Sequence, residues 1–336
     1  MADSARRGAR GAQTAYQREV FGVTDVGLVR EGNEDALVLL DEHDVFVVAD
    51  GMGGHASGEV ASAYTIEAIK AFYASKDIAR RVRAAYRRSR AAEKANGTAP
   101  RDASPHSLRL RKAVESANIS VYRLAQTDDQ LRDMGTTVVA IAFVGSKLYV
   151  ANVGDSRVYR VRNGKLTQLT EDHSLLNEYI RMNLLSPEEI ETFPYKNVIV
   201  RALGLQDTVG VDITTSTVRV GDQFLLCSDG LSDLVRDDTI LDVLQHAPTA
   251  TAACYRLVEA AKERGGHDNI TTLVARIHPP GATLPNSAPS GPPPPPPSTP
   301  PPTTPPPTSP PPTSPPRVAS APAPHGKQRK APGHKH

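Results

Sequence analysis

Four aspartates stand at the ends of short apolar runs or in glycine-bearing turns, and they constrain the fold more than any other feature. They are Asp50, Asp155, Asp229 and Asp268. The first three follow runs that are typical of buried strands, at 45–49, 148–153 and 224–227. A carboxylate in such a place is costly to bury unless it is paired or binds a cation. These positions predict one cluster of oxygen ligands for hard divalent metal ions.

Composition limits the part of the chain that can fold. From Pro279 onward the sequence is dominated by Pro, Ser and Thr, and it holds 24 of the 29 prolines there. So few large apolar residues cannot offset chain entropy by burial. We expect a disordered N-terminus over residues 1–18, one large domain over 19–278 and a disordered tail with a basic end over 279–336. The proline blocks are typical of an extended spacer, and less often of a ligand for a proline-recognising partner.

The formal net charge of +2 gives no argument for nucleic-acid or membrane binding. Charge is uneven, because residues 76–112 carry twelve Lys or Arg against three Asp or Glu. A solvated helix face is the commoner meaning of such a run, and a docking site for an acidic partner is the alternative. The two cysteines form no CxxC motif, and no apolar stretch is long enough to span a bilayer. We expect a cytoplasmic monomer.

Strand-like and helix-like patterns fill the region from residue 21 to residue 277. The strand patterns cover 21–26, 36–40, 45–49, 136–144, 147–153, 156–162, 165–169, 211–218, 223–228 and 270–277. The helical patterns cover 57–74, 78–94, 108–127, 240–246 and 249–264. Short turns between the strands of 136–169 predict antiparallel meanders rather than parallel crossovers. Strands in runs and helices in blocks predict an α+β layered domain.

Seven short motifs follow one another along this region. They are Arg30–Asp35, Asp50–His55, Met134–Thr137, Gly154–Arg157, Arg201–Gly204, Ser228–Asp233 and Asp268–Thr271. In this order they resemble the metal-dependent protein phosphatases, also called type 2C, in their bacterial branch. Each motif alone is weak, and their order over residues 20–278 gives the match its specificity. The resemblance implies a four-layer α-β-β-α sandwich, with two antiparallel sheets flanked by helices.

The resemblance also implies two catalytic Mn²⁺ or Mg²⁺ ions in a cleft at one end of the sandwich. By position, Asp50 would bridge both ions and the Gly51 carbonyl would bind one of them. Asp229 and Asp268 would complete the other site.

Further acidic residues match supporting positions of the family. Glu34 would act through bound water, and Asp35 would support the metal ligands. Asp155, together with Asp229 and Asp233, matches the weaker third metal site of bacterial members.

The activity implied by the resemblance is hydrolysis of phosphoserine and phosphothreonine in proteins by a hydroxide that bridges two metal ions. Arg30 fits the fork that binds two phosphate oxygens, and an ion pair with Glu31 or Glu34 is its alternative role. The proton donor stays open, because Met52 stands where many eukaryotic relatives have a histidine. His55 suits substrate contact or proton donation as well as it suits capping of the next helix.

The leading interpretation is a phosphatase that opposes a bacterial Ser/Thr kinase and acts on that kinase or its substrates. One alternative is a phosphatase of a phosphoserine anti-anti-sigma-type regulator, although such relatives usually carry sensor domains that are not visible here. The other is a non-catalytic metal-binding interaction module, which predicts a loss of ligands that this sequence retains. The segment 175–197 corresponds to the family's variable flap beside the active site.

Overall fold

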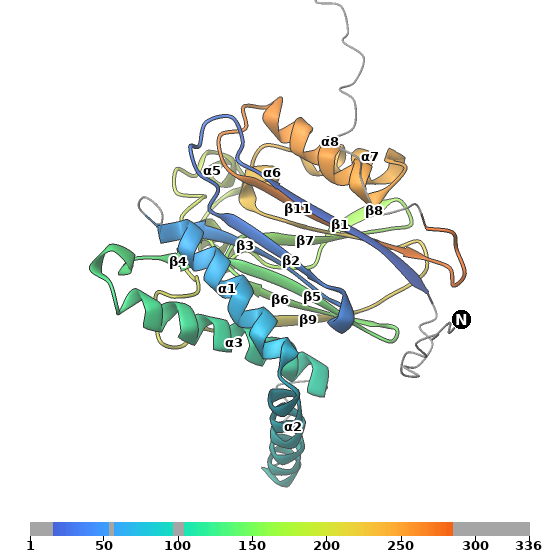
Figure 1. Ribbon diagram of the computed structural model, residues 1–336. Coiled ribbons are helices and arrows are strands. Elements are labelled where there is room, and N and C mark those ends of the chain that lie inside the picture. Colours follow the sequence, from blue (N-terminus) through green and yellow to red (C-terminus); the bar gives the residue numbers. More distant parts are fainter. Residues whose placement is uncertain (1–15, 54–56, 97–103, 285–336) are drawn as a thin grey trace, which may run out of the picture. The chain divides into compact units, whose positions relative to one another are not determined.

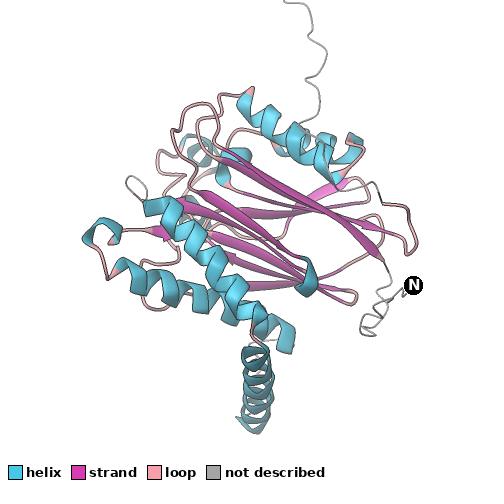
Figure 2. Ribbon diagram, in the orientation of Figure 1, coloured by secondary structure: helices cyan, strands magenta, loops and turns pink. Residues whose placement is uncertain are grey.

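The computed structural model describes residues 16–53, 57–96 and 104–284, which form two antiparallel sheets packed face to face (Figure 1). Helices lie against the outer face of each sheet (Figure 2). The predicted α+β, four-layer α-β-β-α sandwich is therefore confirmed. Within the described residues, no helix has both the length and the apolar character needed to cross a bilayer.

The strand order differs between the two sheets. The first sheet runs β1 (Gln17–Asp25), β11 (Ile270–His278), β10 (Gln223–Cys227), β7 (Arg157–Arg162), β8 (Lys165–Gln168). The second runs β2 (Asp35–Leu40), β3 (Val45–Met52), β5 (Val138–Val144), β6 (Lys147–Val153), β9 (Asp212–Thr217), and the short β4 (Gly135–Thr136) pairs with β3. The expected meander from β5 to β8 crosses from the second sheet to the first between β6 and β7.

The helices divide between the two outer faces. The second sheet is covered by α1 (Ser57–Ala74) and α3 (Pro105–Ala125), with α2 (Lys76–Asn96) packed on α3. The first sheet is covered by α7 (Asp237–His246) and α8 (Ala250–Lys262). The remaining helical segments are α4 (Leu175–Arg181), α5 (Pro187–Thr192), α6 (Asp229–Ser232) and the 3₁₀ turns Asp41–His43 and Asp129–Leu131.

Strand β3 shows why the sequence folds into buried layers. Successive side chains of a strand point to opposite faces, so Val45 and Val47 enter the core beneath the helices while Phe46 and Val48 enter the core between the sheets. Both faces are buried, which explains the continuous apolar run in the sequence. Phe143 packs edge-on against Phe46 in the core between the sheets.

Several expected boundaries differ from the observed ones by a few residues. The domain begins before residue 19, because β1 starts at Gln17 and the buried Tyr16 donates its hydroxyl to the Gly145 carbonyl at 2.7 Å. The expected strand 136–144 is divided between β4 and β5. Helix α3 starts at Pro105, three residues before the expected start at 108, because Ser104 and Ser107 form a capping box around a proline at the first helical position.

Candidate active site

The strand register brings the predicted acidic residues to one end of the sandwich. Asp35 at the start of β2 is paired with Asp50 near the end of β3. In the other sheet, Asp229 follows the end of β10 and Asp268 precedes β11, and these two strands are antiparallel neighbours. Asp155 lies in the turn between β6 and β7. Acidic residues from both sheets therefore meet at the same end of the sandwich.

The motif Met134–Thr137 holds the backbone of Asp50. The Thr137 amide donates to the Asp50 carbonyl at 2.8 Å, and the Thr136 hydroxyl donates to the same oxygen at 2.8 Å. The Asp50 amide donates to the Thr137 hydroxyl at 3.2 Å, and that hydroxyl contacts Ser156 Oγ at 2.7 Å. The Asp50 side chain is thus positioned by strand β3, which is hydrogen-bonded to β2 on one side and to β5 on the other.

Gly51 lies where the backbones of two segments approach each other closely. A Cβ at this position would lie 2.1 Å from the Gly58 carbonyl oxygen and 2.5 Å from the Glu34 carbonyl oxygen. The Gly51 amide donates to the Glu34 carbonyl at 3.0 Å. Only glycine fits here, and the contact joins the start of α1 to the loop that carries Glu34.

Asn269 positions the loop that carries Arg30 and Glu34, a role that sequence reasoning missed. It is buried, and its Oδ1 accepts from the Glu34 amide at 2.7 Å. Its Nδ2 donates to the carbonyls of Val26 at 3.0 Å and Gly32 at 2.9 Å. The only signal in the sequence was its place directly after Asp268.

Arg30 lies on the rim of the acidic cluster with its guanidinium half exposed. Its Nη2 donates to Asp268 Oδ2 at 2.7 Å, and its Nη1 lies 3.8 Å from Glu34 Oε2. The expected alternative of an ion pair with Glu34 is therefore present only as the longer contact. Asp268 is partly exposed, and its Oδ1 accepts from the Asn269 amide at 2.8 Å.

Asp35 joins the two sheets beneath the cluster. It is buried and accepts a hydrogen bond from the Ser228 hydroxyl at 2.7 Å. The Ser228 hydroxyl also accepts from the Thr271 amide at 2.9 Å. The residue before Asp229 is in this way tied to Asp35, which is paired with Asp50.

Crowded carboxylates raise one another's pKa values. Burial raises the pKa of Asp50 well above its usual value, and the charges of Asp35, Asp229, Asp155 and Asp268 raise it further. Burial and then the charge of Asp229 raise the pKa of Asp155 to about 7. The pKa values of Asp35 and Asp229 are also raised, chiefly by burial. The cluster thus concentrates negative charge that a cation would neutralise.

The donor chemistry of the cluster fits hard divalent cations. Glu34 Oε1 and Asp155 Oδ1 are buried and, within the described residues, have no hydrogen-bond partner. The carboxylates of Asp50 and Asp229 are close enough for each to shift the pKa of the other. Among the residues that the structure describes, no group of three or more His, Cys, Asp or Glu side chains has the arrangement of a preformed metal site. The ligands therefore fit by type and proximity, as an all-oxygen set.

The carboxylates expected at a third metal site lie near one another, and the metal site itself stays a prediction. The charges of Asp229, Asp172 and Asp233 all raise the pKa of Asp155, so these carboxylates are neighbours. Asp233 is exposed, and its Oδ2 accepts from Asn197 Nδ2 at 2.9 Å, which links it to the flap segment. Asp172 forms a two-pronged ion pair with Arg157.

The histidines fall into different places. His55 lies outside the described residues, so its expected roles as proton donor or cap stay predictions. His173 is buried; its Nδ1 accepts from the Gly154 amide at 3.0 Å, and its Nε2 lies 2.9 Å from Asp212 Oδ2. His173 thus steadies the turn before Asp155 instead of reaching the acidic cluster.

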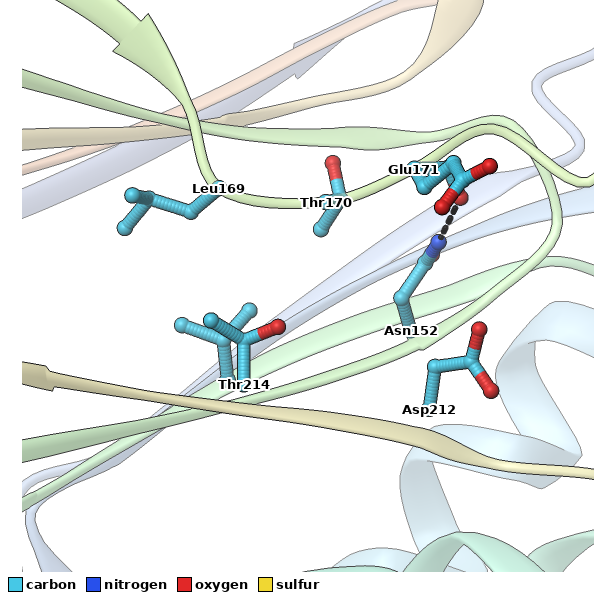
Figure 3. Close-up of a pocket in the computed structure, with 7 residues that line it drawn as sticks. Asn152, Leu169, Thr170, Glu171, Asp212 and Thr214 are labelled. Atoms are coloured by element: carbon cyan, nitrogen blue, oxygen red, sulfur yellow. Dashed lines mark hydrogen bonds between the residues drawn. The ribbon is translucent and has the colours of Figure 1, made fainter. Parts of the chain in front are cut away.

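A cavity of about 210 Å³ lies between the two sheets at their β8 and β9 edges. In Figure 3, Asn152 spans it from β6 and donates to the Glu171 carbonyl at 2.7 Å. Its remaining lining residues are Val150, Leu169, Thr170, Asp212 and Thr214. None of these belongs to the acidic cluster.

The fold is an α-β-β-α sandwich, and it brings a cluster of carboxylates from both sheets together at one end. The family model of protein phosphatase 2C matches residues 30–273. The chain belongs to the protein phosphatase 2C family.

Individual relatives agree with this assignment. The serine/threonine protein phosphatase PstP of Mycobacterium tuberculosis is 37% identical over 257 residues, which are 76% of this chain and 44% of that protein. The serine/threonine phosphatase Stp of Listeria welshimeri is 35% identical over 254 residues, 75% of this chain and 92% of that protein. The chain thus spans less than half the length of the mycobacterial relative.

A solved structure shares the fold. The catalytic domain of PstP in complex with two manganese ions is 34% identical, with a TM-score of 0.62 over 78% of this chain and 98% of that one. This likeness supports metal dependence and does not separate Mn²⁺ from Mg²⁺ as the natural ion.

Proposed function

We propose that this protein is a serine/threonine protein phosphatase that requires divalent metal ions. The observation that carries the proposal is the convergence of Asp50, Asp229, Asp268 and Asp155 from both sheets on one end of the sandwich, beside Arg30. Relatives that are named as such phosphatases match over three quarters of the chain. The retained acidic residues argue against a non-catalytic module.

Asp50, Asp229 and Asp268 would hold two Mn²⁺ or Mg²⁺ ions together with the Gly51 carbonyl, and Glu34 would act through bound water. Asp155 and Asp233 would hold a weaker third ion. When bound, these ions supply a water of lowered pKa as the nucleophile.

The chain's own residues bind and orient the phosphate. Arg30 presents a planar fork at the rim of the cluster, where it can bind two phosphate oxygens and stabilise the charge that develops on them. To do so it must exchange its contact with Asp268 for the phosphate. Asn269 keeps the loop in place during that exchange, because its side chain makes three hydrogen bonds whose partners are all backbone groups.

We further infer that the substrates are phosphoproteins of a Ser/Thr kinase system, including the kinase itself, in the reducing cytoplasm. Both cysteines, Cys227 and Cys254, are buried and free, which accords with such a compartment. A phosphoserine anti-anti-sigma regulator stays the alternative substrate.

Hydrolysis of p-nitrophenyl phosphate and of a phosphothreonine peptide in Mn²⁺ tests the activity. Chelator should abolish it, and Asp50→Ala and Asp229→Ala should each remove it. Asp222→Ala, a buried aspartate at the far end of β10, is the matched control and should retain turnover. Activity that survives both cluster substitutions would reject the metal centre.

A further inference from the structure

Helix α2 differs in charge from the rest of the domain. Eight of its 21 residues are Lys or Arg and two are acidic, which gives a formal charge of +6. The remainder of residues 16–284 carries 23 Lys or Arg against 34 Asp or Glu, a formal charge of −11. The helix is therefore a concentrated positive element on an acidic domain.

Six of these cations form a single row, which we call the cationic stripe. Its members recur at intervals of three or four residues: Lys76, Arg80, Arg83, Arg87, Arg90 and Lys94. All six are exposed. Because an α-helix has 3.6 residues per turn, this spacing puts them on one face over about 27 Å.

The opposite face of α2 is already occupied. Val82 is buried in the core cluster that contains Leu108 and Leu110 of α3, and Ile78 and Tyr86 pack against the same cluster. Beyond Tyr86 no residue of α2 is buried, and Figure 1 shows the helix continuing away from the sheets. Within the described residues, its outer half therefore contributes no side chain to the hydrophobic core.

The stripe contains more charge than its neighbours balance. Arg80 pairs with Asp77 at 3.2 Å. Within the described residues, Arg83, Arg87, Arg90 and Lys94 form no ion pair. Like charges three or four residues apart destabilise a helix. A purely solvated stripe would weaken α2, whereas a negatively charged partner would relieve this repulsion.

We propose that the cationic stripe is a docking site for an acidic helix of a partner protein. A helix with Asp or Glu at the same intervals of three and four residues presents a complementary row of equal pitch. The arginine guanidinium groups of the stripe can bind the carboxylates of such a row through paired hydrogen bonds.

Two other polyanions fit less well. A bilayer needs an exposed apolar face for insertion, and the apolar side of α2 lies against α3. Duplex nucleic acid extends well past one helix, so it would meet the domain whose formal charge outside α2 is −11. An acidic helix can contact the stripe alone.

The stripe is remote from the acidic cluster. Helix α1 begins beside Gly51 and runs for 18 residues, about 27 Å, before α2 starts. A docked partner therefore leaves the acidic cluster free, and the interaction does not depend on the proposed activity.

The test is fluorescence anisotropy with the full chain and a labelled helical peptide that carries Glu at intervals of three and four residues. The variant R83Q/R87Q/R90Q/K94Q should lose at least tenfold in affinity. Glutamine keeps a high helix propensity, and circular dichroism verifies the fold. The control R132Q/K147Q/K165Q/R236Q, with the same loss of charge elsewhere, should change affinity less than twofold.

Further arms decide between the partners. Binding of the peptide should weaken as salt rises, and hydrolysis of p-nitrophenyl phosphate should be equal in both variants. Equal peptide binding by the two variants overturns the proposal. So does tighter binding of duplex DNA or of phosphatidylserine vesicles than of the peptide at one ionic strength, or equal binding of a scrambled peptide of the same composition.

Discussion

Replacement of Asn269 by alanine should separate the positioning of the catalytic loop from the metal ligands themselves. The substitution removes the hydrogen bonds that the side chain of the buried Asn269 makes to the Glu34 amide and to the carbonyls of Val26 and Gly32. At roughly 1 kcal/mol for each net hydrogen bond, the free energy of unfolding should fall by about 3 kcal/mol. For a domain of this size, that lowers the melting temperature by roughly 6–12 °C.

The loss of activity should exceed the loss of folded protein. Once the loop is released, Arg30 and Glu34 no longer hold their positions beside Asp268, and a displacement near 1 Å can reduce turnover about 100-fold. The assay is kcat/KM on a phosphothreonine peptide in saturating Mn²⁺, at a temperature where calorimetry shows the variant to be folded.

Asp222→Ala is the matched control for this experiment. Asp222 is buried, and its side chain takes part in three hydrogen bonds, as the side chain of Asn269 does. The Asp222 carboxylate accepts two of them from Arg162 and one from the Arg219 amide. It lies at the opposite end of β10 from Asp229. It should lose comparable stability and keep kcat/KM within about threefold, as expected for a site with no shared partners. Equal activity losses in the two variants would refute the positioning role of Asn269.

Three further outcomes follow from the same contacts. In chelator, Asp155→Asn should raise the melting temperature at pH 8 and not at pH 4. Burial raises the pKa of Asp155 from 3.8 to about 7, so at pH 8 the ionised carboxylate lowers the free energy of unfolding by up to about 4 kcal/mol. A larger gain in melting temperature at pH 4 would contradict this sign. Arg30→Lys should lower kcat at least tenfold, because an ammonium lacks the two-pronged fork; unchanged kcat would remove Arg30 from the phosphate site. Gly58→Ala should weaken Mn²⁺ binding in calorimetry, because its Cβ would lie 2.5 Å from Glu34 Oε1; unaltered affinity would show that Glu34 is not needed for the metal.

The sequence predicted the layers and the acidic cluster because both depend on local patterns. Apolar runs such as 45–49 become strands that are buried on both faces. An aspartate directly after such a run must lie near the end of its strand. The order of motifs then placed Asp50, Asp229 and Asp268 in one site. What these residues share is a position relative to a strand end, which can be read from the chain.

The supporting contacts could not be predicted in the same way. Asn269 acts through the backbone of residues about 240 positions away, and no local pattern distinguishes an amide that holds a loop from one that faces water. Likewise, no local pattern shows that the His173 ring accepts a hydrogen bond from the Gly154 amide. The start of α3 was misplaced because the helical pattern of apolar residues begins later than the cap at Ser104.

The acidic cluster also connects the site to the core of the fold. Asp50 extends from the second sheet, whereas Asp229 and Asp268 extend from the first, so a cation held by all three would join the two sheets. Their separation is set by the aromatic core between the sheets, where Phe143 packs edge-on against both Phe46 and Phe224. Packed interiors transmit a change in volume instead of absorbing it. Substitution of this core should therefore change metal affinity without touching a ligand, because the spacing of the carboxylates is a property of the sandwich.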